Sequence, residues 1–275
     1  MADTPIRDLT TIEEFRQVVD LERAIWGYTD NADMVGVPVF IFTVHRGAVL
    51  LGAFDAADRM VGFAYAVVGM KGGQRLLWSH MTGVLPEHRG GLGYRLKRAQ
   101  RDRALAQGYE LIEWTFDPMQ AMNAHFNFAK LGGVVTEYAA NFYGESTSAL
   151  HRGTPTDRVV LSWHIGAPHV VRRLEATGLG ARAHDVAKAP VANRTAIDGE
   201  WLRNQHTNLD ITERRLWIEI PTGFTEMQRN APELALEWRL ELRELFETYL
   251  AKHYRAVDFV LQRDAGFGRY LLARD

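Results

Sequence analysis

A glycine-rich turn between an apolar segment and a helical pattern narrows the range of folds open to this chain. Residues 76–84 are apolar enough for a buried strand, residues 86–93 read Pro-Glu-His-Arg-Gly-Gly-Leu-Gly, and residues 111–116 return to a strand pattern. Glycines between a strand and a helix let backbone N–H groups approach phosphate oxygens, and the positive end of the helix dipole adds to the attraction. The turn therefore predicts a pyrophosphate-binding loop, to which Arg89 would add a guanidinium.

Two common phosphate-binding loops do not fit this turn. No Lys-Ser or Lys-Thr pair follows the glycines, which excludes a Walker A loop. Gly90, Gly91 and Gly93 are more crowded than the dinucleotide-binding pattern allows, and a long run of helical and strand patterns precedes the strand. A different class of cofactor is therefore expected.

The turn resembles motif A of the GNAT superfamily of acyl-CoA N-acyltransferases, which reads Gln/Arg-x-x-Gly-x-Gly/Ala between the fourth strand and the third helix. Two registers are open: residues 88–93 keep the Gly-x-Gly with histidine in the first place, and residues 86–90 leave the loop one residue short. The resemblance implies a GNAT-type mixed α/β fold that binds an acyl-CoA, either acetyl-CoA or succinyl-CoA. The residues that it places against CoA are Val84, Leu85, Arg89, Gly90, Gly91, Leu92, Gly93, Tyr94 and Asn123.

The patterns of residues 5–165 follow the element order of that superfamily, β-α-α-β-β-β-α-β-α-β-β. Thr11 and Glu14 form a capping box that predicts the first helix. In the helix after the glycine turn, Leu92 and Leu96 share an apolar face, whereas Lys97 is expected to point outward with the neighbouring basic residues. The later strands are expected at 48–55, 60–70, 76–85, 111–116, 134–138 and 158–164, and the later helices at 91–107 and 123–131.

Residues 166–275 are expected to form a smaller extension to a catalytic domain of residues 1–165. The first part of the extension, 166–215, is less regular and contains a loop-like stretch at 181–193. The rest predicts a β-α-β-β unit, an order that would suit a degenerate second GNAT-like half. Its elements are expected at 215–221, 232–254, 257–262 and 269–273.

Composition and charge limit the partners and the chemistry. A net charge of −2 gives no reason to expect nucleic acid or an anionic membrane as a partner. The absence of cysteine excludes disulfides, thiolate metal sites and a cysteine nucleophile, and the histidines lack metal-ligand spacing, so no metal is expected. Without a signal-peptide pattern or a membrane-spanning apolar run, a cytoplasmic protein is the simplest expectation.

The candidate general base is His80. In the GNAT fold the pantetheine arm lies in a gap between the fourth and fifth strands, and the reaction needs a neutral amine. His80 lies four residues before Val84, which predicts that both side chains share one face of the strand, and an imidazole titrates near neutral pH. The alternative is a structural histidine buried in the sheet with both nitrogens hydrogen-bonded.

The usual general acid of the superfamily is replaced in this chain. Phe128 occupies the place of a tyrosine two residues before Lys130, so Tyr143 or a bound water would have to protonate the leaving thiolate. Tyr143 would otherwise be an ordinary core or loop residue. Asn123, beside the CoA arm in the resemblance, is also compatible with a helix N-cap.

A longer branch of GNAT-like proteins, some of them associated with N-succinylation of amino acids, is similar to this chain in three segments. These are residues 114–118, 141–144 and 155–158. An acidic substrate would require a guanidinium, and Arg158 is the candidate. Its alternative role is a structural ion pair with Asp157 or another carboxylate. Asp117, before a proline, equally suits a turn cap.

The sequence therefore predicts an acyltransferase that moves an acetyl or succinyl group from CoA to a primary amine, with an amino acid as the favoured acceptor. Attack would be direct, in a ternary complex, because no cysteine is available for an acyl-enzyme. One alternative is a non-catalytic acyl-CoA sensor, and another is an enzyme that uses acyl carrier protein or aminoacyl-tRNA, although the near-neutral charge argues against RNA. The extension would cover the active site, form a homodimer interface or exchange strands between subunits.

Overall fold

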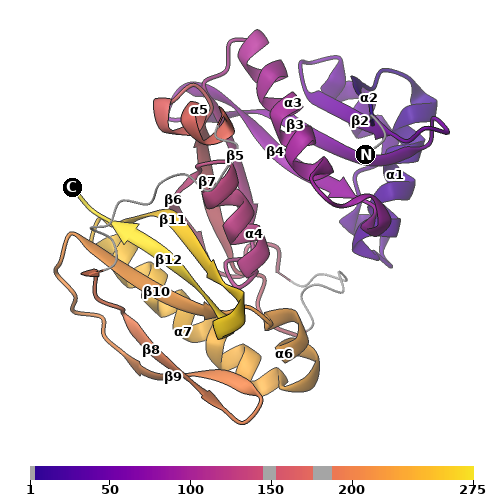
Figure 1. The fold of residues 1–275 in the computed structure, drawn as a ribbon. Coiled ribbons are helices and arrows are strands. Elements are labelled where there is room, and N and C mark those ends of the chain that lie inside the picture. Colours follow the sequence, from indigo (N-terminus) through magenta and orange to yellow (C-terminus); the bar gives the residue numbers. More distant parts are fainter. Residues whose placement is uncertain (1–3, 145–152, 176–187) are drawn as a thin grey trace. The chain divides into compact units, whose positions relative to one another are not determined.

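The computed structural model describes residues 4–144, 153–175 and 188–275 (Figure 1). It has a mixed α/β fold, as predicted, and residues 6–164 follow the predicted element order. The chain divides into two compact units, one of residues 1–114, 146–150 and 164–166, the other of residues 115–145, 151–163 and 167–275. The predicted division into domains after residue 165 stays a prediction. It was based on the order of the elements, whereas these units are defined by compactness.

The first unit contains a sheet whose neighbouring strands follow the chain order. All its pairs are antiparallel except the last, between β4 and β5, which is parallel. The strands are β1 (Ile6–Asp8), β2 (Val49–Phe54), β3 (Met60–Lys71), β4 (Gln74–Val84) and β5 (Leu111–Phe116), the last of which ends in the second unit, and the helices are α1 (Ile12–Trp26), α2 (Val37–Val44) and α3 (Leu92–Ala106).

Helix α1 begins at the predicted capping box. The Thr11 hydroxyl accepts the Glu14 N–H at 3.3 Å, and the Glu14 carboxylate accepts the Thr11 N–H at 3.0 Å. Such caps satisfy N–H groups that have no partner inside the helix. The helix then ends at Gly27, whose φ of 65° is left-handed.

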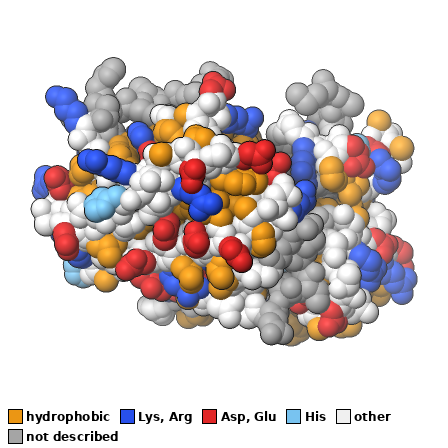
Figure 2. Space-filling view, turned by 90° about the horizontal axis from the view of Figure 1, so that it is seen from below, with side chains coloured by type: hydrophobic (Ala, Val, Ile, Leu, Met, Phe, Trp, Pro, Cys, Tyr) orange, Lys and Arg blue, Asp and Glu red, His pale blue; other side chains and the backbone are white. Residues whose placement is uncertain are grey.

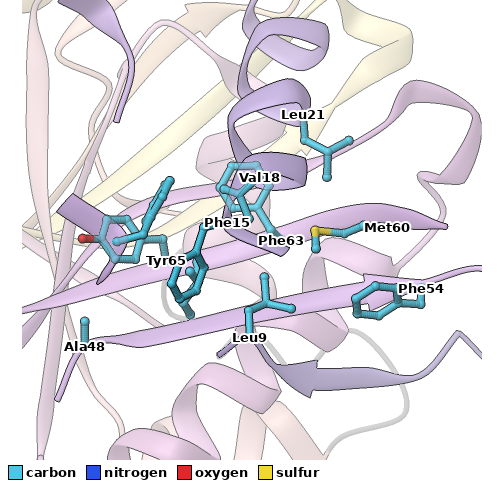
Figure 3. Packing of buried hydrophobic residues seen from close by; sticks show 11 residues of the cluster. Leu9, Phe15, Val18, Leu21, Ala48, Phe54, Met60, Phe63 and Tyr65 are labelled. Carbon is cyan, nitrogen blue, oxygen red and sulfur yellow. The ribbon is translucent and has the colours of Figure 1, made fainter. Parts of the chain in front are cut away.

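Helices α1 and α2 pack on one face of this sheet through a cluster of apolar side chains, drawn in Figure 3. The ring centroid of Phe40 lies 6.1 Å from that of Phe15 and 4.9 Å from that of Tyr65. Helix α3 lies on the opposite face, because a Cβ on Gly62 would meet Leu96, whereas its neighbour Phe63 packs against Trp26. The sheet thus has a helix on each side of β4.

The second unit contains a sheet with the strand order β7-β6-β11-β12-β10 and a separate β8–β9 hairpin. Figure 1 shows the long helix α7 beside the sheet of this unit. The strands are β6 (Val134–Ala139), β7 (Arg158–His164), β8 (Asn193–Asp198), β9 (Trp201–Thr207), β10 (Arg215–Pro221), β11 (Arg255–Gln262) and β12 (Phe267–Ala273), and the helices are α4 (Ala121–His125), α5 (Pro168–Glu175), α6 (Phe224–Asn230) and α7 (Pro232–Ala251).

The predicted β-α-β-β unit is confirmed as β10, α7, β11 and β12, with α6 inserted before α7. The region 166–215, which was expected to be less regular, contains α5, β8 and β9, none of which was predicted. The strands of the hairpin carry mostly polar side chains and few buried ones, and therefore lack the apolar alternation by which strands are recognised. Residues 181–187 of the predicted loop lie outside the described residues.

Two ion pairs attach α7 within the second unit. The Arg239 guanidinium binds the Asp117 carboxylate in bidentate fashion, with both side chains nearly inaccessible to solvent. One turn later, Arg243 binds Asp157, whose carboxylate also accepts the Tyr138 hydroxyl at 2.6 Å. These arginines fix the register of α7, because removing either would leave a buried charge unpaired.

Among the described residues, no helix has the length and apolar character needed to cross a membrane. Figure 2 shows Asp and Glu side chains interspersed with Lys and Arg over the face that it draws. Neither sign of charge dominates that face.

Candidate functional site

Strand β4 carries an irregularity at His80. In its pairing with β3, Met81 lies opposite Tyr65 and Ser79 lies opposite Ala66, so His80 is an extra residue in the ladder. A β-bulge of this kind shifts the alternation of side chains by one position. His80 and Met81 therefore both lie on the α1 side of the sheet, where the His80 and Tyr65 ring centroids are 6.1 Å apart.

The bulge overturns the expectation that His80 and Val84 share one face. Gly62 lies opposite Val84, and a Cβ on Gly62 would touch both Val84 and Leu96 of α3. Val84 thus lies on the α3 side, opposite to His80. The alternation of an unbroken strand, on which the expectation rested, is interrupted by the extra residue.

Among the described residues, one edge of β4 has no strand partner after Trp78. On the β5 side, Leu77 pairs with Ile112 and Trp78 pairs with Glu113. Strand β4 itself continues to Val84. The Leu85 N–H binds the Val61 carbonyl, so Val84 and Thr82 belong to non-hydrogen-bonded pairs with β3, and their main-chain groups point to the β5 side. These groups form a row of donors and acceptors that an extended ligand can bind.

The glycine turn follows directly from this edge. Gly90 and Gly91 have φ values of 95° and 109°, which side chains other than glycine adopt at a cost. Gly91 is the N-cap of α3, and no side chain caps the helix there. A Cβ on Gly90, Gly91 or Gly93 would meet no atom within 4 Å, so the start of α3 opens onto free space.

This arrangement suits an anionic ligand at the start of α3. The first N–H groups of a helix lack partners within the helix and carry the positive end of its dipole. Arg89 is exposed beside the turn, and Tyr94, on the first turn, lies under the guanidinium of Arg98 at 5.9 Å. Leu92, by contrast, is 6 % exposed and anchors the helix in the core.

His80 combines an exposed ring with close protein surroundings. Its side chain is accessible to solvent, yet the protein atoms packed around it remove enough water to lower the pKa of His80. The neutral imidazole is therefore the main form near neutral pH. A neutral histidine at a bulge, next to an open strand edge, can accept a proton.

Helix α1, on the same face of the sheet as His80, carries a buried acid that sequence reasoning missed. Glu22 of α1 has no solvent exposure, and burial raises its pKa from 4.5 to about 7. One carboxylate oxygen accepts the Val35 N–H at 2.9 Å, while the other has no partner within the described residues. Glu22 also raises the pKa of Tyr65, although burial of the phenol is the larger cause. A glutamate between Leu21 and Ile25 on an apolar helix face was the signal in the sequence.

The expectation that Lys97 faces solvent is also wrong. Its side chain is 3 % exposed, and it lies on the side of α3 that faces β4 and β5. An amphipathic pattern counts every lysine as a surface residue, and that rule failed here because Lys97 finds neutral partners in Ser79 and Gln100.

The other site candidates belong to the second unit. Tyr143 is 44 % exposed, its hydroxyl is 3.2 Å from that of Thr115, and the Arg158 guanidinium lies 5.1 Å from its ring centre. Asp157, one of the carboxylates expected as a structural partner of Arg158, binds Arg243. Burial would raise the pKa of Asp117, but the charges of Arg239 and Arg158 lower it, so Arg158 does interact with another carboxylate. Tyr143 and Arg158 are thus brought together, as parts of one cluster within that unit.

Helix α4 differs in detail from its prediction. It begins after Gln120, so Asn123 is an exposed residue inside the helix and not its N-cap. The helix continues as a π-helical segment, Phe126–Lys130, in which Phe128 is fully buried against Tyr270 at 5.7 Å between ring centroids. Asp117 accepts the Met119 N–H at 2.9 Å, which is the expected turn cap.

No protein-family model matches this chain, and no curated protein sequence matches it. Solved structures similar to part of it include GNAT-family acetyltransferases. One from Streptococcus pneumoniae is 14 % identical, with 58 % of this chain and 98 % of that chain covered and a TM-score of 0.47. A GNAT superfamily phosphinothricin acetyltransferase from Sinorhizobium meliloti, in complex with acetyl-CoA, is 18 % identical, with 58 % and 86 % covered and a TM-score of 0.47.

An aminoglycoside 6'-acetyltransferase type Ii is 19 % identical, with 58 % of this chain and 97 % of that chain covered and a TM-score of 0.44. At these identities and TM-scores, the likenesses are not evidence for the substrate or the chemistry of this chain. Among the described residues, no three His, Cys, Asp or Glu side chains come together as a metal site.

Replacing Gly91 by alanine is expected to weaken CoA binding by at least about tenfold, because its φ of 109° is strained for alanine and the turn would shift. Gly93→Ala is the matched control. Gly93 lies in helical backbone with open space around a Cβ, so alanine there should preserve binding and raise the thermal midpoint. Calorimetric titration with CoA and thermal unfolding test both variants, and equal binding by both would contradict the assigned turn.

Glu22→Gln is expected to remove a pH dependence of stability. Because the folded-state pKa of Glu22 is raised from 4.5 to about 7, the folded protein holds this proton more tightly, and stability falls as pH rises across that window. The variant should therefore be more stable above pH 7, by up to roughly 3 kcal/mol. Urea unfolding at several pH values measures this, with the exposed Glu13→Gln as control. An unchanged pH slope in Glu22→Gln would contradict the buried acid.

Proposed function

We propose that this chain is a GNAT-type acyltransferase that moves an acyl group from acyl-CoA to a primary amine. The observation that carries the proposal is continuity: the open edge of β4, with the main-chain groups of Thr82 and Val84, leads directly into a glycine turn and an uncapped helix start at Gly91. An extended amide-containing arm suits the strand edge, and a pyrophosphate suits the helix start. One CoA molecule contains both chemical parts.

In this proposal the acyl-CoA donates its acyl group without a covalent enzyme intermediate. The amine nitrogen attacks the thioester carbonyl carbon, the C–S bond breaks, and the CoA thiolate takes up a proton. The proton lost by the amine passes to His80, directly or through a water. The lowered pKa of His80 supports this role, because the imidazole is neutral and ready to accept a proton at neutral pH.

The acceptor in this proposal is an amino acid, and Arg158 binds its carboxylate. The guanidinium over the Tyr143 ring and the exposed Tyr143 hydroxyl support a polar binding surface in the second unit. Tyr143 is the proposed source of the proton for the leaving thiolate, because Phe128 has no acidic group and is buried in the core.

The proposal assigns residues 1–165 to the GNAT domain and residues 166–275 to an extension, in a cytoplasmic homodimer. Exposed apolar side chains on α2 and β3 support a subunit interface in the first unit. They are Val39, Phe42, Val68 and Met70, with exposures from 41 % to 66 %.

The first test separates binding from chemistry. His80→Gln is expected to bind acetyl-CoA as tightly as the wild-type protein and to lose about 100-fold or more in kcat, since general-base catalysis contributes that much. The wild-type kcat/KM should fall only below the ordinary pKa of histidine, because the pKa of His80 is lowered. The exposed His206→Gln serves as control. Binding of CoA thioesters with no turnover on any amine would favour the non-catalytic sensor.

Arg158→Ala is expected to raise KM for an amino acid by about 10- to 100-fold, because a charge-assisted hydrogen bond to the substrate carboxylate is lost. For a matched amine acceptor that has no carboxylate, the variant and the wild-type protein should have the same KM. Steady-state kinetics with both acceptors gives the answer, and Arg194→Ala, an exposed arginine of β8, is the control. Equal losses with both acceptors would contradict carboxylate recognition by Arg158.

A further inference from the structure

We propose that Lys97 and Gln100 form a buried receptor for a carboxylate at the end of the donor's acyl group, so that the preferred donors are CoA thioesters of dicarboxylic acids. This inference rests on the proposed acyltransferase function and names the acyl class that it serves.

Lys97 is a buried amine, and within the described residues no carboxylate pairs with it. Its ammonium nitrogen is 2.7 Å from the Ser79 hydroxyl, 3.1 Å from the Gln100 carbonyl oxygen and 3.7 Å from the Trp114 ring centre. Burial lowers the pKa of Lys97 from 10.5 to about 7, and no carboxylate in the described part of the chain counteracts this effect. A buried ammonium normally has a charged partner.

Gln100 adds an unsatisfied donor at the same place. Its side chain has no solvent exposure, and its carbonyl oxygen accepts from Lys97. Its amide nitrogen is buried and has no hydrogen-bond partner within the described residues. An amide N–H buried without an acceptor costs free energy. The Gln100 amide therefore lacks an acceptor and Lys97 lacks an anionic partner, and a single carboxylate would provide both.

The position of this pair suits the end of an acyl chain. Ser79 is the first residue of β4 after the last pair with β5, and it directly precedes the bulge at His80. The receptor therefore lies beside the first unpaired position of β4, on the α3 side of the strand. Val84, where β4 ends, is about 16 Å along the strand from Ser79, and the glycine turn follows Val84 in the chain. A donor held by its pyrophosphate at the turn and extended along β4 directs its acyl group toward Lys97.

The charge of the acyl group decides how well it fits. A terminal carboxylate could replace the Ser79 hydroxyl as partner of Lys97 and accept from the Gln100 amide. It would also favour the ammonium form of Lys97, so binding should take up a proton near neutral pH. A neutral acyl chain of the same length supplies no acceptor and leaves both donors as they are.

The test compares succinyl-CoA with n-butyryl-CoA, which has a methyl group in place of the carboxylate. By isothermal titration, the wild-type protein is expected to bind succinyl-CoA about 10- to 100-fold more tightly. Lys97→Met should abolish this preference and leave the affinity for butyryl-CoA within about threefold. Titration in buffers of different ionisation enthalpy should reveal proton uptake with succinyl-CoA in the wild-type protein alone.

The variants allow a structural role to be distinguished. Methionine keeps the length of the lysine stem and removes a buried amine, so Lys97→Met should unfold at a temperature no lower than the wild-type protein. Gln100→Leu is expected to reduce the preference for succinyl-CoA by a smaller factor. Arg16→Met, at an exposed position on α1, should leave both affinities unchanged.

Each result has a separate meaning. If wild-type protein and Lys97→Met bind both thioesters equally, without proton uptake, Lys97 is a structural residue and the receptor is disproved, whereas acyl transfer from acetyl-CoA would still support the proposed function. If no CoA thioester binds, the proposed function itself fails, and the receptor with it.

Discussion

The loss of pairing between β4 and β5 after Trp78 and Glu113 is the constraint on which the rest of the site depends. Strand edges inside a protein are expensive, because each N–H and C=O that leaves water needs another partner. The chain keeps six further residues of β4 and then turns through two left-handed glycines into an uncapped helix. The main-chain groups along this strand edge and at the following helix start lack strand or capping partners. One extended ligand could form hydrogen bonds with both sets.

The sequence predicted features that depend on a few adjacent residues. It did not predict features that depend on contacts between distant segments. The capping box at Thr11 and the glycine turn were predictable, because a few adjacent residues determine their geometry. The bulge at His80 was not, because it exists only in the register between β3 and β4, and it moved His80 away from the face of Val84. The burial of Lys97 depends in the same way on Ser79 and Trp114, which lie on two different strands.

The two faces of β4 each carry a buried group that weakens the fold near neutral pH. Glu22 lies under the α1 face, and its raised pKa means that ionisation opposes folding. Lys97 lies under the α3 face, and its lowered pKa means that protonation opposes folding. A core needs neither group, since methionine or glutamine of similar size would remove the desolvation cost. Groups that break the rules of core packing on both sides of one strand are typical of a functional site.

The opposite signs of these two groups fit the two substrates of an acyl transfer. An amine acceptor brings positive charge and must lose a proton, and Glu22, an acid of raised pKa, lies on α1, which packs on the same face of the sheet as His80. A donor with a terminal carboxylate brings negative charge, and Lys97 lies on the other face, bound to Ser79 just after the last pair of β4 with β5. The bulge at His80 divides the two environments, because it reverses the direction of the side chains between Ser79 and Val84. Helices α1 and α3 thus place an acid on one face of the sheet and a lysine on the other, and in the proposed function the acyl group and the amine would meet at the edge of β4.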